Sequence, residues 1–224
     1  MKILIIDTET TSADKDCEYI EVAYLDILLP SAESIDCDIL DTFEQRYKPT
    51  KEITLGALAT HHIHIDDLEK CPTTGTFTLP GDVRYLIGHN IDFDWRALGT
   101  PDVRRIDTLA LARYFMPELD SHTQSALLYF IMGKGATNHL RNAHSALADV
   151  YICLRILEYI LEVHVGYTSI EHLYEISEVA RIPTIMPFGK HRGERIKEDV
   201  PYGYKSWLLS QPDVDPYLQI ALRK

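Results

Sequence analysis

The sequence contains few cysteines, and their spacing suggests neither a covalent framework nor a bound metal. Only four occur in 224 residues: Cys17, Cys37, Cys71 and Cys153. The absence of any C-x-x-C pair argues against a disulfide scaffold and against a zinc site. We therefore expect reduced thiols.

Long hydrophobic runs are also lacking. The apolar stretch at residues 1–6 ends at Asp7 and is far too short for a signal sequence, and no later stretch reaches membrane-spanning length. Hydrophobic residues make up 46% of the chain and charged residues 25%, which is the ordinary globular range. We expect a soluble, cytoplasmic protein with no membrane partner.

Positive charge is scarce. The chain has 22 Lys and Arg against 34 Asp and Glu, a net charge of −12, so no sequence-wide basic footprint for nucleic acid exists. Residues 181–224 hold eight Lys and Arg and five Asp and Glu, a net of +3, which leaves −15 on residues 1–180. Any contact with a polyanion must therefore be local, and the basic end is the C-terminal one.

Hydrophobic periodicity predicts a layered α/β fold. Strands are predicted at 2–6, 19–29, 39–47, 83–87 and 104–106, with the first three forming an antiparallel meander. Helices are predicted at 106–115, 124–132 and 143–163, and a short one through 95–98. The polar stretch 8–17 is expected to be a loop.

The last part of the chain changes character. Prolines and glycine at 183, 187 and 189 interrupt the helical pattern, and a hairpin at 188–196 and a helix at 202–210 are predicted after them. We expect two units: residues 1–180 as the main domain and residues 181–224 as a small basic hairpin-helix extension.

Two acids follow the first predicted strand directly. Asp7 and Glu9 stand two apart, so in an extended chain both carboxylates point the same way. Such close like charges repel unless divalent cations neutralise them, and hard oxygen ligands favour Mg²⁺ or Mn²⁺. A D-x-E pair alone is weak, because an ordinary structural pair is commoner.

Two further segments carry acids at strand ends or helix starts. In His89 to Asp94, Asp92 and Asp94 compete for the same role. In His144 to Asp149 the acid stands among small apolar residues of the long helix, where a buried charge needs a partner; an exposed acid on an amphipathic helix is the alternative. Four acids from three segments, with a histidine beside one, fit two-metal phosphodiester hydrolysis.

The three motifs resemble those of the DEDD exonucleases of the ribonuclease H-like fold, which carry D-x-E, H-N-x-x-F-D and H-x-x-x-x-D in this order. The resemblance implies a mixed five-stranded sheet flanked by helices. It favours Asp94 over Asp92, and it makes Asp107 a structural helix cap. Ser145, where the other branch has tyrosine, and His144 mark the histidine branch.

The C-terminal extension is similar to that of the exodeoxyribonuclease X type. Phe188-Gly189-Lys190-x-Arg192-Gly193 is followed by Tyr204-x-x-Trp207-Leu208. One departure is Ser12, which stands where the family usually has glycine. Because the adjoining loop lies next to the scissile end in relatives, this change bears on how a duplex end is handled.

The resemblance implies a 3′-5′ exonuclease that cuts DNA from the 3′ end of single strands or duplexes, releases nucleoside 5′-monophosphates and serves in DNA repair or end trimming. Two divalent ions would be held by Asp7, Glu9, Asp94 and Asp149, with His144 as the base. Residues implied to contact nucleic acid are Thr8, Thr10, His62, His89, Asn90, Lys190 and Arg192.

Several alternatives stay open at this point. Instead of contacting nucleic acid, His89 would order its own turn. The basic residues of the C-terminal extension would instead form a solvated turn. The enzyme class has rivals in an exoribonuclease of the ribonuclease T or oligoribonuclease kind, whose substrate would be RNA, and in a proofreading-type exonuclease subunit. A binding module with a degenerate site is the non-enzymatic alternative.

Overall fold

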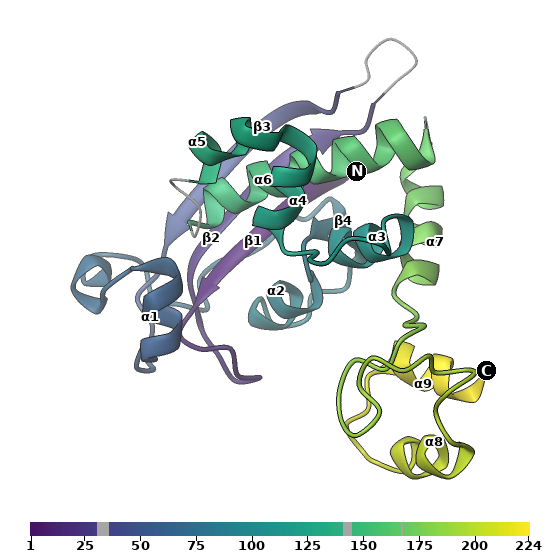
Figure 1. Ribbon diagram of the computed structural model, residues 1–224. Helices are drawn as coiled ribbons and strands as arrows, with labels where there is room; N and C mark the ends of the chain where they lie inside the picture. Colours follow the sequence, from purple (N-terminus) through teal and green to yellow (C-terminus); the bar gives the residue numbers. More distant parts are fainter. Residues whose placement is uncertain (31–35, 141–144, 167) are drawn as a thin grey trace.

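A mixed five-stranded sheet forms the centre of the protein (Figure 1). The computed structural model describes residues 1–30, 36–140, 145–166 and 168–224. The strands are β1 (Lys2–Thr10), β2 (Tyr19–Leu28), β3 (Asp38–Arg46), β4 (Val83–Gly88) and β5 (Arg104–Asp107), in the order β3-β2-β1-β4-β5. The first three form the expected antiparallel meander, and β4 and β5 continue the sheet in parallel with β1. The predicted ribonuclease H-like sheet is confirmed.

Strand β1 is longer than its apolar run. The loop predicted at 8–17 is wrong for its first three residues, because the strand continues to Thr10 and pairs with β2 through Thr8↔Val22 and Glu9↔Glu21. Residues 11–17 form the loop as predicted. Backbone pairing with β2 does not require apolar side chains, so the strand persists through residues whose polarity suggested a loop. Asp7 and Glu9 therefore lie within the strand, on the same face of the sheet as Ile3 and Ile5.

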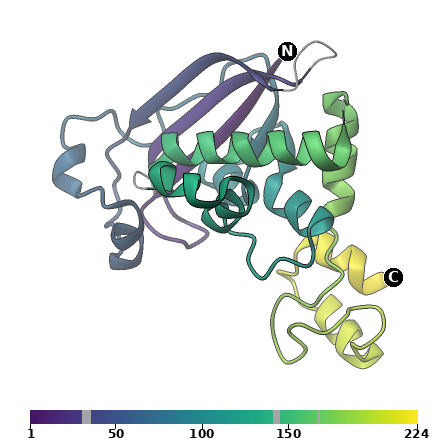
Figure 2. The same cartoon turned by 45° about the horizontal axis from the view of Figure 1, so that its top comes forward.

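Helices cover both faces of the sheet. Their bounds are α1 (Leu55–His61), α2 (Asp92–Ala97), α3 (Thr108–Phe115), α4 (Gln124–Met132), α5 (Ala136–Leu140), α6 (Ala146–Ile160), α7 (Ile170–Ala180), α8 (Tyr202–Leu209) and α9 (Pro216–Arg223), with short turns η1 (Ile65–Leu68), η2 (Gly133–Gly135) and η3 (Leu161–Val165). Helix α6 runs across one face of the sheet (Figure 2). Among the described residues no helix combines the length and the apolar character needed to cross a bilayer.

Capping explains where the predicted helices differ from the observed ones. Helix α3 begins at Thr108 because Asp107 ends β5 and caps the helix, accepting hydrogen bonds from the backbone N–H of Leu109 and Ala110. Helix α6 begins at Ala146, with Ser145 as its N-cap, and continues past Ile160 as the π-helical turn η3. Residues 143 and 144 of the predicted helix lie outside the described residues.

Two apolar cores fix the sheet between its layers. Ile3, Ile5 and Leu25 pack with Val150 and Leu157 of α6 on one face. On the other face the core is formed by residues that include Leu4, Ile6, Val22, Leu86 and Ile91. The alternation along β1 thus sends odd-numbered side chains towards α6.

The C-terminal residues form a third apolar core of their own, which includes Met186, Ile196, Leu208 and Leu218. A single bridge, Ile185↔Arg195, stands where a full hairpin was expected, α8 lies where predicted, and α9 was not foreseen. Figure 1 shows this part, in yellow-green, beyond α7 and away from the sheet. The division of the chain at residue 180 stays a prediction.

Candidate active site

Three carboxylates meet where α6 crosses β1. Asp7 and Glu9 share one face of β1, and Asp149 lies in the first turn of α6, which packs against that face. One carboxylate oxygen from each residue lies within 4.8 Å of the others. The helix and the strand thus bring together acids that stand far apart in the sequence.

Asp94 joins this group through the backbone of β1. The parallel ladder between β1 and β4 ends at Ile5↔Ile87, so Thr8 lies beyond it. The Thr8 N–H and hydroxyl both donate to Asp94 Oδ1, at 2.9 and 2.8 Å. The buried Asp94 carboxylate is thereby fixed against the residue that separates Asp7 from Glu9.

Asp92 faces a different environment, although it stands only two residues away. Its carboxylate pairs with both Arg105 and Arg181, and Arg105 in turn lies over the ring of Trp95, 3.9 Å from the centroid. These partners neutralise Asp92, so it has no need of a metal ion. These surroundings favour Asp94 over Asp92 as a metal ligand.

Burial and mutual repulsion raise the pKa values of the clustered carboxyl groups. The pKa of Asp7 is raised well above its usual range, first by burial and then by the charges of Asp94 and Asp149. Burial, reinforced by Asp149, raises the pKa of Glu9 to about 8. Burial also raises the pKa of Asp94 to about 7, against the lowering effect of the Thr8 hydrogen bonds.

Such a group fits divalent cations. Buried like charges at this spacing need a counter-charge, and carboxylate oxygens are the ligands that hard divalent ions prefer. The site therefore has the donors and the charge of a metal centre.

The turn between β4 and α2 is held by side chains behind it. Asn90, whose φ is +70°, donates its backbone N–H to Asp107 Oδ1 at 2.9 Å. His89 contacts Thr108 Oγ1 through Nδ1 at 3.0 Å and the His122 carbonyl through Nε2 at 2.8 Å. Burial lowers the pKa of His89 to about 4, so its ring is neutral. These contacts favour the turn-ordering role for His89.

His144, the predicted base, lies outside the described residues. The structure describes the chain again from Ser145, the N-cap of α6, whose hydroxyl accepts from the Ala148 N–H at 3.3 Å.

One positioning residue was not found from the sequence patterns. Glu21, buried on β2 opposite Glu9, accepts from the Ala146 N–H at 2.9 Å and from Arg46 Nε at 2.8 Å. The signal that could have revealed it was an acid between Ile20 and Val22 in a mostly apolar strand.

Besides His89 and Asn90, the residues implied to contact nucleic acid lie in three places. Thr8 and Thr10 belong to β1, and the Thr10 hydroxyl donates to the Ser12 carbonyl. His62 is exposed at the end of α1, in the left-handed region with φ +57°. Lys190 and Arg192 are exposed in the C-terminal part. The first group adjoins the carboxylates in β1, and the others lie on separate elements.

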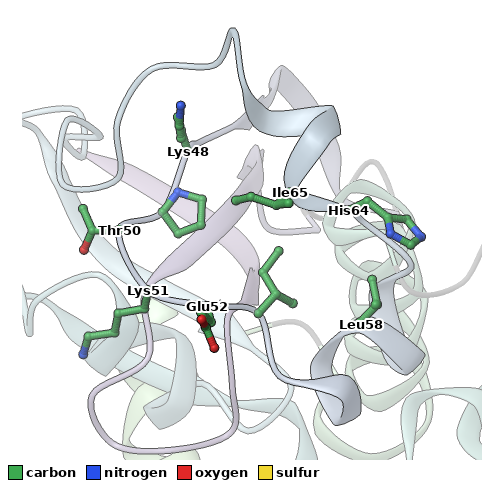
Figure 3. A pocket seen from close by; sticks show the side chains of 9 residues that line it. Lys48, Thr50, Lys51, Glu52, Leu58, His64 and Ile65 are labelled. Atoms are coloured by element: carbon green, nitrogen blue, oxygen red, sulfur yellow. The ribbon is translucent and has the colours of Figure 1, made fainter.

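The loop that contains Ser12 is braced by the segment before α1. Glu18 accepts hydrogen bonds from the N–H and hydroxyl of Thr50, and the Thr54 N–H donates to the Thr11 carbonyl at 2.9 Å. A cavity of about 530 Å³ opens beside this segment, lined by Lys48, Pro49, Thr50, Lys51, Glu52, Ile53, Leu58, His64 and Ile65 (Figure 3). It therefore adjoins the His62 segment.

The sheet, the crossing helix and the buried carboxylates together define a nuclease of ribonuclease H-like architecture. The chain belongs to the exonuclease family whose model, RNase_T, matches residues 4–157. The DEDD resemblance is thereby confirmed, and the protein is a hydrolase that acts as a nuclease. A comparison with curated protein sequences finds no match.

Solved structures support this assignment. Exonuclease X in complex with 5′ overhanging duplex DNA is 25% identical, with a TM-score of 0.61, and the match covers 78% of this chain and 99% of that one. Escherichia coli exonuclease I in complex with a dA16 oligonucleotide shares the fold at 17% identity and a TM-score of 0.55, covering 82% of this chain and 44% of that one. Cell-death related nuclease 4 shares it at 15% identity and a TM-score of 0.51, covering 73% and 64%.

Proposed function

We propose that this protein is a 3′-5′ exonuclease that hydrolyses DNA from its 3′ end, releases nucleoside 5′-monophosphates, and acts in DNA repair or end trimming. The observation that carries the proposal is the group formed by Asp7, Glu9 and Asp149, with Asp94 fixed to it through Thr8. The likeness to exonuclease X bound to duplex DNA supports DNA as the substrate. Four free cysteines support a cytoplasmic location.

The carboxylates would hold two divalent ions, Mg²⁺ or Mn²⁺. Asp7, Glu9 and Asp149 would bind the first, and Asp7 with Asp94 the second. When bound, such ions supply Lewis-acid activation of water and neutralise charge on the leaving oxygen. Thr8 keeps Asp94 in place, and Glu21 keeps the start of α6 against β2, so both ligands from the helices hold their positions.

His144 would take the proton from the attacking water, since a histidine pKa near 6.5 suits proton transfer at neutral pH. Replacing His144 with alanine should lower turnover by about 10² to 10⁴ while Mn²⁺ affinity stays unchanged. Single-turnover cleavage and metal titration measure the two effects. The exposed His172 provides the control variant His172→Ala. Full turnover in His144→Ala would exclude the proposed base.

The substrate and polarity are tested together. Matched DNA and RNA oligonucleotides, 5′-labelled, single-stranded or duplex, are incubated with Mg²⁺ and sampled over time. We expect a ladder of DNA products shortened at the 3′ end, absent in Asp149→Asn. Internal cuts alone would overturn the proposal. A faster RNA ladder would favour the exoribonuclease, since discrimination depends on contacts to the 2′-OH.

Two other functions predict distinct outcomes. A proofreading-type subunit would remove a mismatched 3′ terminus faster when a polymerase is added, so a rate that is unchanged by polymerase argues against it. A binding module with a degenerate site would bind oligonucleotides and show no cleavage with either Mg²⁺ or Mn²⁺.

A further inference from the structure

Large aromatic side chains are exposed together in the C-terminal part. Phe188 is 47% exposed, Trp207 54% and Tyr202 84%. They lie in the turn at 188–193 and in α8, beside an apolar core that buries Met186 and Leu208 instead. Exposed aromatic side chains gathered in so small a unit mark a surface that binds something.

The turn and the helix form one continuous surface. Gly189 has a φ of +75°, which favours glycine, and a Cβ at this position would lie 2.6 Å from the Tyr204 hydroxyl, so the turn rests directly on a side chain of α8. The ring of His191 lies 4.5 Å from that of Tyr204, and Tyr204 lies 5.3 Å from Trp207. The rings of His191, Tyr204 and Trp207 therefore run from the turn on to the helix, and Phe188 directly precedes Gly189 in that turn.

Two cations flank this aromatic surface. Lys190 and Arg192 stand on either side of His191 in the turn, and both are exposed. His191 pairs with Glu194, and Arg195 with Asp199. Within the described parts of the chain, neither Lys190 nor Arg192 takes part in an ion pair. Their charge can therefore act on an anionic ligand, in a chain whose other residues carry a large negative excess.

The C-terminal part is anchored to the helix that carries Asp94. Arg181 pairs with Asp92 in α2 and with Glu178 in α7, and its guanidinium lies 4.4 Å from the ring centre of Tyr217 in α9. The Tyr217 hydroxyl donates to Glu178 at 2.7 Å. Figures 1 and 2 both show α9 beside the end of α7. The aromatic surface is thus tied to the framework of the catalytic carboxylates.

We propose that this surface binds unpaired nucleotides of the strand that the enzyme degrades. Bases stack on Phe188 and Trp207, while Lys190 and Arg192 contact phosphates. Aromatic side chains interleaved with cations are the combination that binds single strands without sequence preference, and the local positive charge favours a polyanion over an uncharged protein surface. The inference rests on the proposed nuclease function, since it assigns a second contact to the same substrate.

Binding without cleavage is measured in EDTA, by the fluorescence anisotropy of a labelled single-stranded DNA of about 20 nucleotides, enough to span one such site. Trp207→Ala and Phe188→Ala should each weaken binding by about tenfold, the effect of removing one stacked base. The double variant Lys190→Glu, Arg192→Glu should bind more weakly, with a salt dependence shallower by about 0.7 for each phosphate that the protein no longer neutralises. Since none of the four side chains is buried, circular dichroism should show intact folds.

Matched controls come from elements outside the C-terminal part. Tyr114→Ala removes an aromatic side chain of the same exposure, 53%, and Arg84→Glu reverses an exposed charge at the far end of β4; both should bind as the wild type does. In a Trp95→Phe background Trp207 is the remaining tryptophan, and oligonucleotide should quench its fluorescence. Quenching would report stacking directly.

The outcomes separate this inference from the proposed function. Suppose that the wild-type protein shortens DNA in Mg²⁺, that the variants bind DNA as tightly as the wild type does, and that Trp207 is not quenched. The proposed nucleic-acid surface is then wrong while the nuclease function stands, and the exposed aromatic side chains would instead bind a protein partner. A wild-type protein that cuts no oligonucleotide overturns the nuclease, whatever the variants bind.

Discussion

Asp92 and Asp94 share one short helix and have opposite electrostatic surroundings. Two arginines neutralise Asp92, whereas Asp94 accepts from the neutral N–H and hydroxyl of Thr8 and faces other carboxylates. An acid with arginine partners serves the fold, whereas an acid held by neutral donors beside like charges is suited to bind a metal ion. The difference lies in the neighbours, which come from β1, β5 and the end of α7.

Glu9 offers a measurable consequence of this repulsion. Its pKa rises from 4.5 to about 8 in the fold, so the metal-free folded state binds a proton that the unfolded chain has released. Stability is therefore lost as the pH rises from 4.5 towards 8, and nothing is lost below that window. Glu9→Gln should stabilise the metal-free protein near pH 8 by roughly 2 to 3 kcal/mol. Urea unfolding in EDTA measures the gain.

The same variant should lose its advantage when metal is present. Saturating Mg²⁺ stabilises the wild type by binding only its folded state, whereas Glu9→Gln lacks one ligand. The exposed Glu69 provides the control Glu69→Gln, which should change little in either condition. A gain that persists unchanged at about pH 4, where the carboxyl is protonated in both states, would contradict the electrostatic explanation.

At the residue level, the sequence revealed side chains whose chemistry follows from spacing. Asp7 and Glu9 share a face because strands alternate, and this holds although the strand is longer than expected. Glu21 escaped because its role depends on a backbone N–H of α6, 125 residues away. The sequence favoured Asp94 over Asp92 only through the family resemblance, since the arginines that pair with Asp92 are brought in by the fold.

The end of β4 is the element on which Asp94 depends. A Cβ on Gly88 would lie 2.7 Å from Ile91 Cδ1 and 3.1 Å from the Ile6 carbonyl oxygen. Gly88→Ala should therefore push β4 and the start of α2 away from β1. We expect the unfolding free energy to fall by about 1 to 3 kcal/mol and cleavage to become slower. Chemical unfolding and single-turnover kinetics measure the two effects.

A second glycine provides the matched control for this element. A Cβ added to Gly56 in α1 would meet nothing within 4 Å, so Gly56→Ala should be neutral or slightly stabilising. If both alanine variants behave alike, the close approach of β4 to β1 does not position Asp94.

Elements were predictable where local patterns agree with tertiary contacts. Helix α4 lies where its periodicity placed it. Strand β1 ran past its apolar residues because β2 offers backbone partners there. Helix α9 was missed, although Asp215 as N-cap and Pro216 in the first turn are a recognised start signal. Its eight residues are too few for the hydrophobic periodicity to indicate a helix.

For the whole molecule, charge asymmetry indicated that the C-terminal residues differ from the rest, and their separate apolar core agrees with that expectation. What the sequence could not indicate is how this part is attached. The attachment depends on Arg181, which reaches α2, α7 and α9 at once. Such a joint combines residues from three separated segments and has no local pattern.

Arg181 should therefore hold the C-terminal part in place. Its side chain is only 4% exposed, so Arg181→Met leaves the Asp92 carboxylate partly uncompensated and should cost about 3 to 5 kcal/mol. Amide hydrogen exchange should accelerate in residues 182–223 and in α2. The half-exposed Arg155, which pairs with the buried Glu158, supplies the control Arg155→Met. Glu158 keeps the Cys37 N–H as a donor, so this change should cost less than Arg181→Met and leave exchange in residues 182–223 unchanged. Equal exchange in both variants would mean that the apolar contacts of α9 fix the C-terminal part without Arg181.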